Sequence, residues 1–95
     1  MKVTVDSNLL IKNIFEPPIS IQFKEKEVSL RELIKRLGDI CYMIEFLFGD
    51  ELGNDVNKLT VNNTNFLILP QGLGTPLKDG DMIYVDILWD SITGG

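Results

Sequence analysis

The sequence contains no histidine and a single cysteine, Cys41. One cysteine cannot form an intramolecular disulfide, and without histidine the chain lacks the usual ligands of a zinc site. A hydrolase triad is excluded as well, because Ser7 and Thr93 have no histidine to act as a base. We expect a protein of the reducing cytoplasm. Cys41 lies in an apolar run with no neighbouring cation, which favours a small buried hydrophobe over a reactive thiol.

Basic residues are in the minority: 9 Lys and Arg stand against 14 Asp and Glu, which gives a net charge of −5 at pH 7. Binding to a phosphate backbone needs clustered Lys and Arg, so this balance argues against nucleic acid as a partner. An acidic chain is better suited to a basic protein surface, which it meets faster through long-range attraction.

Long apolar runs are also missing. The apolar stretch 40–48 is too short to span a bilayer and contains Glu45. Residues 1–6 lack the apolar core of a signal peptide. We therefore expect neither export nor a membrane anchor.

The composition is that of a soluble globular protein, with 44% hydrophobic and 24% charged residues among 95. A chain of this size forms one domain, residues 1–95, with a single core. Val3 and Val5 alternate with polar residues and predict a strand, and a second alternating run at 19–23 follows Pro17-Pro18. Residues 9–11 extend the first strand or cross the sheet.

Ser29 and Glu32 have the spacing of a capping box, which predicts that a helix begins there. Four apolar residues at helical spacing form a face wide enough to cover a sheet: Leu30, Leu33, Ile34 and Leu37. Gly38-Asp39 predicts a stop or a kink. The run 40–48 is compatible with a helix or a strand, and its phase favours a helix.

The second half of the chain reads as strands and turns. Residues 49–55 predict a mobile loop. A short strand at 58–61, the turn Asn62-Asn63 and a strand-like run at 66–69 predict a hairpin or tight bend. A loop at 70–76 and a turn at 78–81 precede a last strand from Met82 to about Trp89. The order strand, strand, helix, strands predicts an α+β fold, a mixed sheet packed on one main helix.

The last strand divides its side chains between two faces. The face without charge is the predicted core: Ile83, Val85, Ile87 and Trp89. The other face offers Met82, Tyr84 and Leu88 as candidates for an apolar patch that binds a partner, with Ile92 beyond them. An ordinary solvated sheet surface is the alternative. Asp79 and Asp81 flank a turn glycine without an evident third ligand, so we expect no metal site.

Residues 90–95 form a short tail that ends on Gly94-Gly95. A carboxylate becomes a good electrophile when ATP converts it into an acyl-adenylate. Glycines have no Cβ, so an extended tail of this kind can enter a narrow channel in an activating enzyme. Taken alone, two terminal glycines also describe an ordinary frayed chain end.

Three segments carry a resemblance to a known family: 58–63, 72–81 and the glycines 94–95. Together with the N-terminal strand and the helix opened by Ser29, they resemble the β-grasp sulfur carriers. These are the small subunit of molybdopterin synthase, the thiamine sulfur carrier and the ubiquitin-related modifiers. The most specific part is the run Thr75-Pro76-Leu77-Lys78-Asp79-Gly80-Asp81 with the terminal glycines. Residues 90–93 depart from the proline-containing tail of the molybdopterin branch, which leaves the pathway open.

The resemblance implies a β-grasp (ubiquitin-like) fold and a carrier rather than an enzyme. An E1-like adenylating enzyme would use ATP to activate Gly95, and a sulfur donor would convert Gly95 to a thiocarboxylate. The chain would bind no cofactor and would have no catalytic residue of its own. A large synthase subunit would accept the tail, with molybdopterin-type cofactor biosynthesis as the first expectation. The alternatives are a modifier joined to lysines of another protein, a carrier for tRNA thiolation, and an adaptor with an inert tail.

Overall fold

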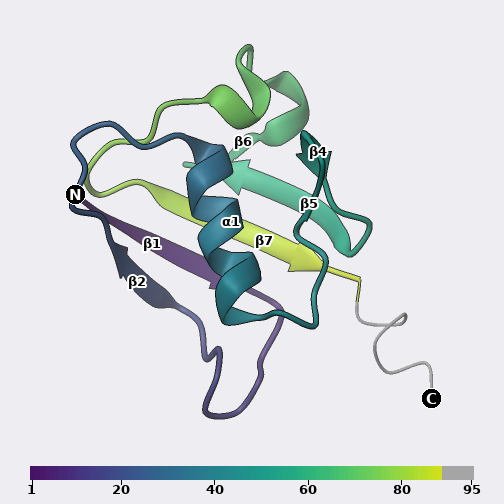
Figure 1. Cartoon of the computed structure of the whole chain (residues 1–95). Helices are drawn as coiled ribbons and strands as arrows, with labels where there is room; N and C mark the ends of the chain where they lie inside the picture. The colour runs from purple at the N-terminus through teal and green to yellow at the C-terminus, as the bar shows by residue number, and fades with distance from the viewer. Residues whose placement is uncertain (89–95) are drawn as a thin grey trace.

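Five strands form one mixed sheet in the computed structural model, which describes residues 1–88. The elements in chain order are β1 (Lys2–Ser7), β2 (Ile19–Gln22), α1 (Leu30–Ile40), β3 (Leu47–Phe48), β4 (Glu51–Leu52), β5 (Val56–Val61), β6 (Thr64–Asn65), the 3₁₀ turns η1 (Phe66–Ile68) and η2 (Gly72–Gly74), and β7 (Met82–Ile87). The sheet order is β2-β1-β7-β5-β6, and β3 pairs only with β4. Strands β1 and β7 run parallel at the centre, and the other neighbours are antiparallel. The predicted α+β fold, with a mixed sheet and one main helix, is confirmed (Figure 1).

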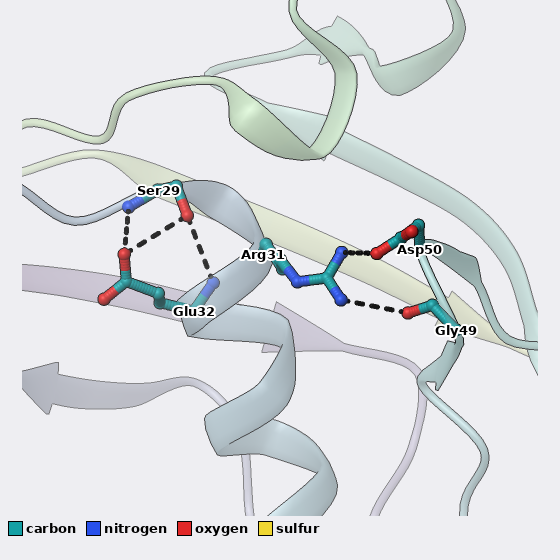
Figure 2. A network of polar contacts seen from close by, with 5 residues as sticks. All are labelled: Ser29, Arg31, Glu32, Gly49 and Asp50. Carbon is teal, nitrogen blue, oxygen red and sulfur yellow. Dashed lines mark hydrogen bonds and ion pairs between the residues drawn. The ribbon is translucent and has the colours of Figure 1, made fainter.

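Helix α1 begins at the predicted capping box. The amide of Glu32 donates to Ser29 Oγ at 3.4 Å, and the amide of Ser29 donates to Glu32 Oε1 at 3.3 Å (Figure 2). The four residues of the predicted apolar face are all fully buried: Leu30, Leu33, Ile34 and Leu37. Burial of each such side chain contributes about 1.5–3 kcal/mol, so this stripe fixes the helix on the sheet.

The core under α1 comes mainly from the two central strands. Val3 and Val5 of β1 and Ile83, Val85 and Ile87 of β7 are at most 2% exposed, as predicted. β7 ends at Ile87 rather than near Trp89, which lies outside the described residues. β1 ends at Ser7, so residues 9–11 do not extend it, and Ile11 forms an isolated bridge with Phe15. No helix within residues 1–88 has the length and apolar character to cross a membrane.

The helical prediction for 40–48 is wrong, and so is the stop at Gly38-Asp39. α1 continues through both residues to Ile40, because a glycine inside a helix costs only about 1 kcal/mol. Cys41 ends it with φ −115° and ψ 70°, and its amide still donates to the carbonyl of Leu37. Of the apolar residues that follow, Ile44 and Phe46 are buried without helical spacing, whereas Tyr42 and Met43 are exposed, and the run ends in strand β3.

The segment 49–55 is not the open loop that its composition predicts. Glu51 pairs with Phe48 across a tight β3–β4 hairpin, and Gly49 provides the positive φ of 62° that the turn requires. Arg31 of α1 joins this turn: Arg31 Nη1 lies 2.9 Å from an Asp50 carboxylate oxygen, and Nη2 donates to the Gly49 carbonyl at 3.1 Å (Figure 2). The hairpin is therefore tied to the first turns of the helix.

The β5–β6 turn is the predicted one, with Asn62 and Asn63 at φ 50° and 70°. The strand prediction for 66–69 is wrong. The side chain of Asn65 accepts a hydrogen bond from the amide of Leu67 at 2.9 Å and starts the 3₁₀ turn η1 instead. This turn leaves Leu67 and Ile68 85% and 72% exposed, so a local side-chain cap overrides an apolar run.

Candidate functional site

The sheet face opposite α1 is open along strand β7. Met82 is 51% exposed, Leu88 41%, and Tyr84 is half-buried between them, whereas the alternating residues Ile83, Val85 and Ile87 are buried in the core. α1 crosses only the other face (Figure 1). The structure therefore places Met82 and Tyr84 on one accessible face of β7, and Leu88 is exposed directly after the end of the strand. Ile92, the fourth, lies outside the described residues.

A shallow hollow of about 370 Å³ lies on this surface, which we call the open face. Its lining comes from four strands or turns: Asp6, Lys58, Thr60, Asn63, Met82 and Tyr84. Asp6 of β1 and Thr60 of β5 both pair with Tyr84, one on each side. Leu88 follows β7 at its end and does not line the hollow.

The chemistry of the open face is an apolar centre with a charged rim. Lys58 lies opposite Asp86 in the ladder, and the Asn57 side chain donates to an Asp86 carboxylate oxygen at 2.8 Å. Aromatic and methionine side chains surrounded by polar groups are typical of protein–protein interfaces. The sequence pattern does not predict Asp6, Lys58 and Thr60 as site residues, because only the strand register brings them beside Tyr84. Their one signal in the sequence is the alternation along their own strands.

The carboxylates of the Asp79–Asp81 turn are used inside the fold. Asp81 accepts from the amide of Lys78 at 2.7 Å and from the side chain of Asn62 at 2.9 Å. Asp79 accepts from the amide of Lys2 at 2.7 Å. Within residues 1–88, no three His, Cys, Asp or Glu side chains gather as metal ligands. These aspartates hold the start of β7 against β1 and the β5–β6 turn.

Cys41 is fully buried at the end of α1, as predicted, and burial raises the pKa of its thiol from the ordinary 9.0 to about 11.

Between pH 9 and 11 the Cys41 thiol of the folded chain therefore holds a proton that the unfolded chain has released. We expect stability to fall as pH rises from 9 towards 11, and the native thiol to resist iodoacetamide at pH 8. Denaturant midpoints for wild type and Cys41→Ala over this pH range isolate the thiol. If the midpoints of the two proteins changed with pH in parallel, the raised pKa of the Cys41 thiol would be contradicted.

Comparison of the chain with protein-family models, with curated proteins and with solved structures finds no match. The described part of the chain supplies an open sheet face and a central strand, β7, that leads towards the paired glycines. Gly94 and Gly95 themselves lie outside the described residues.

Proposed function

We propose that this chain is a β-grasp sulfur carrier, activated at Gly95 by adenylation and converted there to a thiocarboxylate. The sheet order and the single helix between β2 and the later strands are compatible with a β-grasp fold. The observation that carries the proposal is the position of β7. It lies between β1 and β5 at the centre of the sheet, and within residues 1–88 it is the last strand, ahead of Gly94-Gly95 in the sequence.

A central strand is a suitable support for a reactive tail, because hydrogen bonds to neighbours on both sides fix the direction of the strand. The proposed chemistry needs nothing else from this chain. The Gly95 carboxylate attacks the α-phosphorus of ATP in the E1-like enzyme, and pyrophosphate leaves. Hydrosulfide delivered by a sulfur donor then displaces AMP and leaves the thiocarboxylate. The acids and bases for both steps belong to the partner enzymes.

The open face is the proposed docking surface for these partners. Met82 and Tyr84 supply apolar contact area, and the carboxylates of Asp6 and Asp86 give the rim an acidic character around Lys58. With a net charge of −5, the chain is attracted to a basic partner surface. The partner that finally uses the sulfur is, on this proposal, the large subunit of a molybdopterin-type synthase.

Intact mass analysis of the protein isolated from its own host tests the proposal. We expect a species in which one carboxyl oxygen is replaced by sulfur, with the change located at Gly95 by fragmentation. The same measurement establishes whether Gly95 carries the free carboxylate that the chemistry requires. Adducts joined through Gly95 to lysines of other proteins would instead identify a modifier. Recovery of the unmodified carboxylate alone, under sulfur-replete conditions, would contradict both functions and favour an adaptor.

A further inference from the structure

The end of strand β7 is paired on the β1 side by side chains rather than by a strand. β1 stops at Ser7, opposite Val85, although β7 continues to Ile87. The hydroxyl of Ser7 donates to the Val85 carbonyl at 2.6 Å. The carboxamide of Asn8 then bonds Ile87 twice: Nδ2 donates to its carbonyl at 3.0 Å, and Oδ1 accepts from its amide at 2.8 Å.

These bonds reproduce the ladder that a longer β1 would make. Along β7 the odd-numbered residues direct their backbone groups to β1, as the bond from the Thr4 amide to the Asp81 carbonyl establishes at the other end. After Ser7 the chain turns away, and its backbone no longer meets Val85 and Ile87. A hydroxyl and a carboxamide supply the missing donors and acceptor, so the ladder is complete through the end of β7.

The opposite side of the strand end is held by backbone. The Leu88 amide donates to the Asp55 carbonyl at 2.9 Å, and Asp55 is itself fixed because its carboxylate accepts from the Glu45 amide at 2.8 Å. The strand end is thus held from both sides, through Ile87 by Asn8 and through Leu88 by Asp55. These bonds fix the position and direction of the last described residues, at the end of β7.

We propose that Asn8 is a positioning residue for the tail, and this inference rests on the proposed function. Once a partner has docked on the open face, the fixed strand end restricts where Gly95 can travel. This restriction raises the local concentration of the carboxylate at the partner's active site. Asn8 does not line the open-face hollow, so its loss should act on the delivery of the tail more than on docking.

The carboxamide is the group that the position requires. Its donor and acceptor, on one planar group, match the carbonyl and amide of a single strand residue. Aspartate would keep the acceptor but would place a second oxygen against the Ile87 carbonyl. Alanine would remove both bonds and leave those backbone groups to water. We therefore expect Asn8→Asp and Asn8→Ala to loosen the strand end, each without a new steric clash.

The test measures adenylation of the full chain by the E1-like enzyme of the same host, through ATP–pyrophosphate exchange. For Asn8→Ala and Asn8→Asp we expect kcat to fall about tenfold, with KM for the carrier changed less than about threefold, because misplacement of a reacting group lowers the rate at a given affinity. Amide hydrogen exchange by NMR is read in parallel at Ile87 and Leu88. Both amides should exchange faster in the variants.

Asn62→Ala is the matched control. Asn62 also makes two side-chain bonds at an end of β7, to the Met82 amide and the Asp81 carboxylate, but at the end away from the tail. It should lose at least as much stability as the Asn8 variants, since alanine is also strained at the φ of 50° of this position, and keep the wild-type kcat. A wild-type kcat in both Asn8 variants, or an equal fall in Asn62→Ala, would overturn the positioning role. Failure of the wild-type chain to be adenylated would overturn the proposed function itself, so the two failures are distinguishable.

Discussion

Deletion of Gly94 and Gly95 is expected to abolish adenylation, with a loss of at least about 10³-fold in kcat/KM, because the reacting carboxylate is no longer delivered to ATP. In the shortened chain the carboxylate would lie on Thr93. At about 3.5 Å per extended residue, it would fall roughly 7 Å short of the position that the Gly95 carboxylate reaches. The last residue would also be β-branched, and a narrow channel that admits glycine excludes such a side chain. Pyrophosphate exchange with the E1-like enzyme measures the effect.

The fold should be unaffected by this deletion. Every residue of the hydrophobic core lies between Val3 and Ile87 among the described residues. We expect the thermal midpoint to stay within about 2 °C of wild type, because the deletion removes none of these core residues. Unimpaired adenylation, or full function of the truncated chain in its host, would contradict the carrier proposal and favour an adaptor.

Tyr84→Lys separates docking from tail chemistry. The substitution places a charge at the centre of the open face, where Tyr84 contributes to the hollow with Met82. If partners dock there, KM for the carrier should rise about tenfold or more while kcat at saturation is retained. Deletion of Gly94 and Gly95 should instead lower kcat, since the rate of adenylation stays low at any concentration of the shortened carrier. Equal effects on kcat and KM in both proteins would mean that the two regions do not act separately.

The elements that local chemistry determines were predictable. The Ser29 capping box fixed the start of α1, and alternation assigned the buried faces of β1 and β7. The β3–β4 hairpin was not predictable, because two-residue strands leave no period to detect, and its contact with Arg31 joins residues that are far apart in the sequence. The helical prediction for 40–48 was wrong for a related reason, because an apolar segment without a period can be buried in any conformation.

Part of the candidate site was predictable from local pattern and part was not. Alternation along one strand is enough to predict that Met82, Tyr84 and Leu88 share a face. Asp6 and Lys58 join them only through the parallel β1–β7 register and the antiparallel β5–β7 register. Asn8 had no sequence signal, since an asparagine after a strand usually indicates a turn. Its bonds to Ile87 depend on a residue far along the chain that a local pattern does not contain.

Gly53→Ala is expected to be the most destabilising single substitution considered, because Gly53 lies against the backbone of Glu45. A Cβ at this position would lie 2.6 Å from the carbonyl carbon of Glu45 and nearer still to its oxygen. Neither side can yield easily, since the Gly53 amide donates to the Phe46 carbonyl at 2.8 Å and the Asn54 amide to the Glu45 carboxylate at 3.0 Å. Forcing backbone apart in this way costs about 3 kcal/mol.

Thermal and denaturant unfolding measure this cost, with Gly38→Ala as the matched control. A loss of about 3 kcal/mol lowers the midpoint by roughly 12–24 °C in a domain of this size. A Cβ at Gly38 meets no atom within 4 Å, and alanine in a helix is favoured by about 0.5–1 kcal/mol, so that variant should be slightly more stable. Similar midpoints for the two variants would show that the Glu45 backbone can move aside. Movement of the Glu45 backbone would also displace Asp55, which accepts hydrogen bonds from the amides of both Glu45 and Leu88. Faster exchange of the Leu88 amide in Gly53→Ala would then show that the β3–β4 hairpin and the end of β7 are coupled.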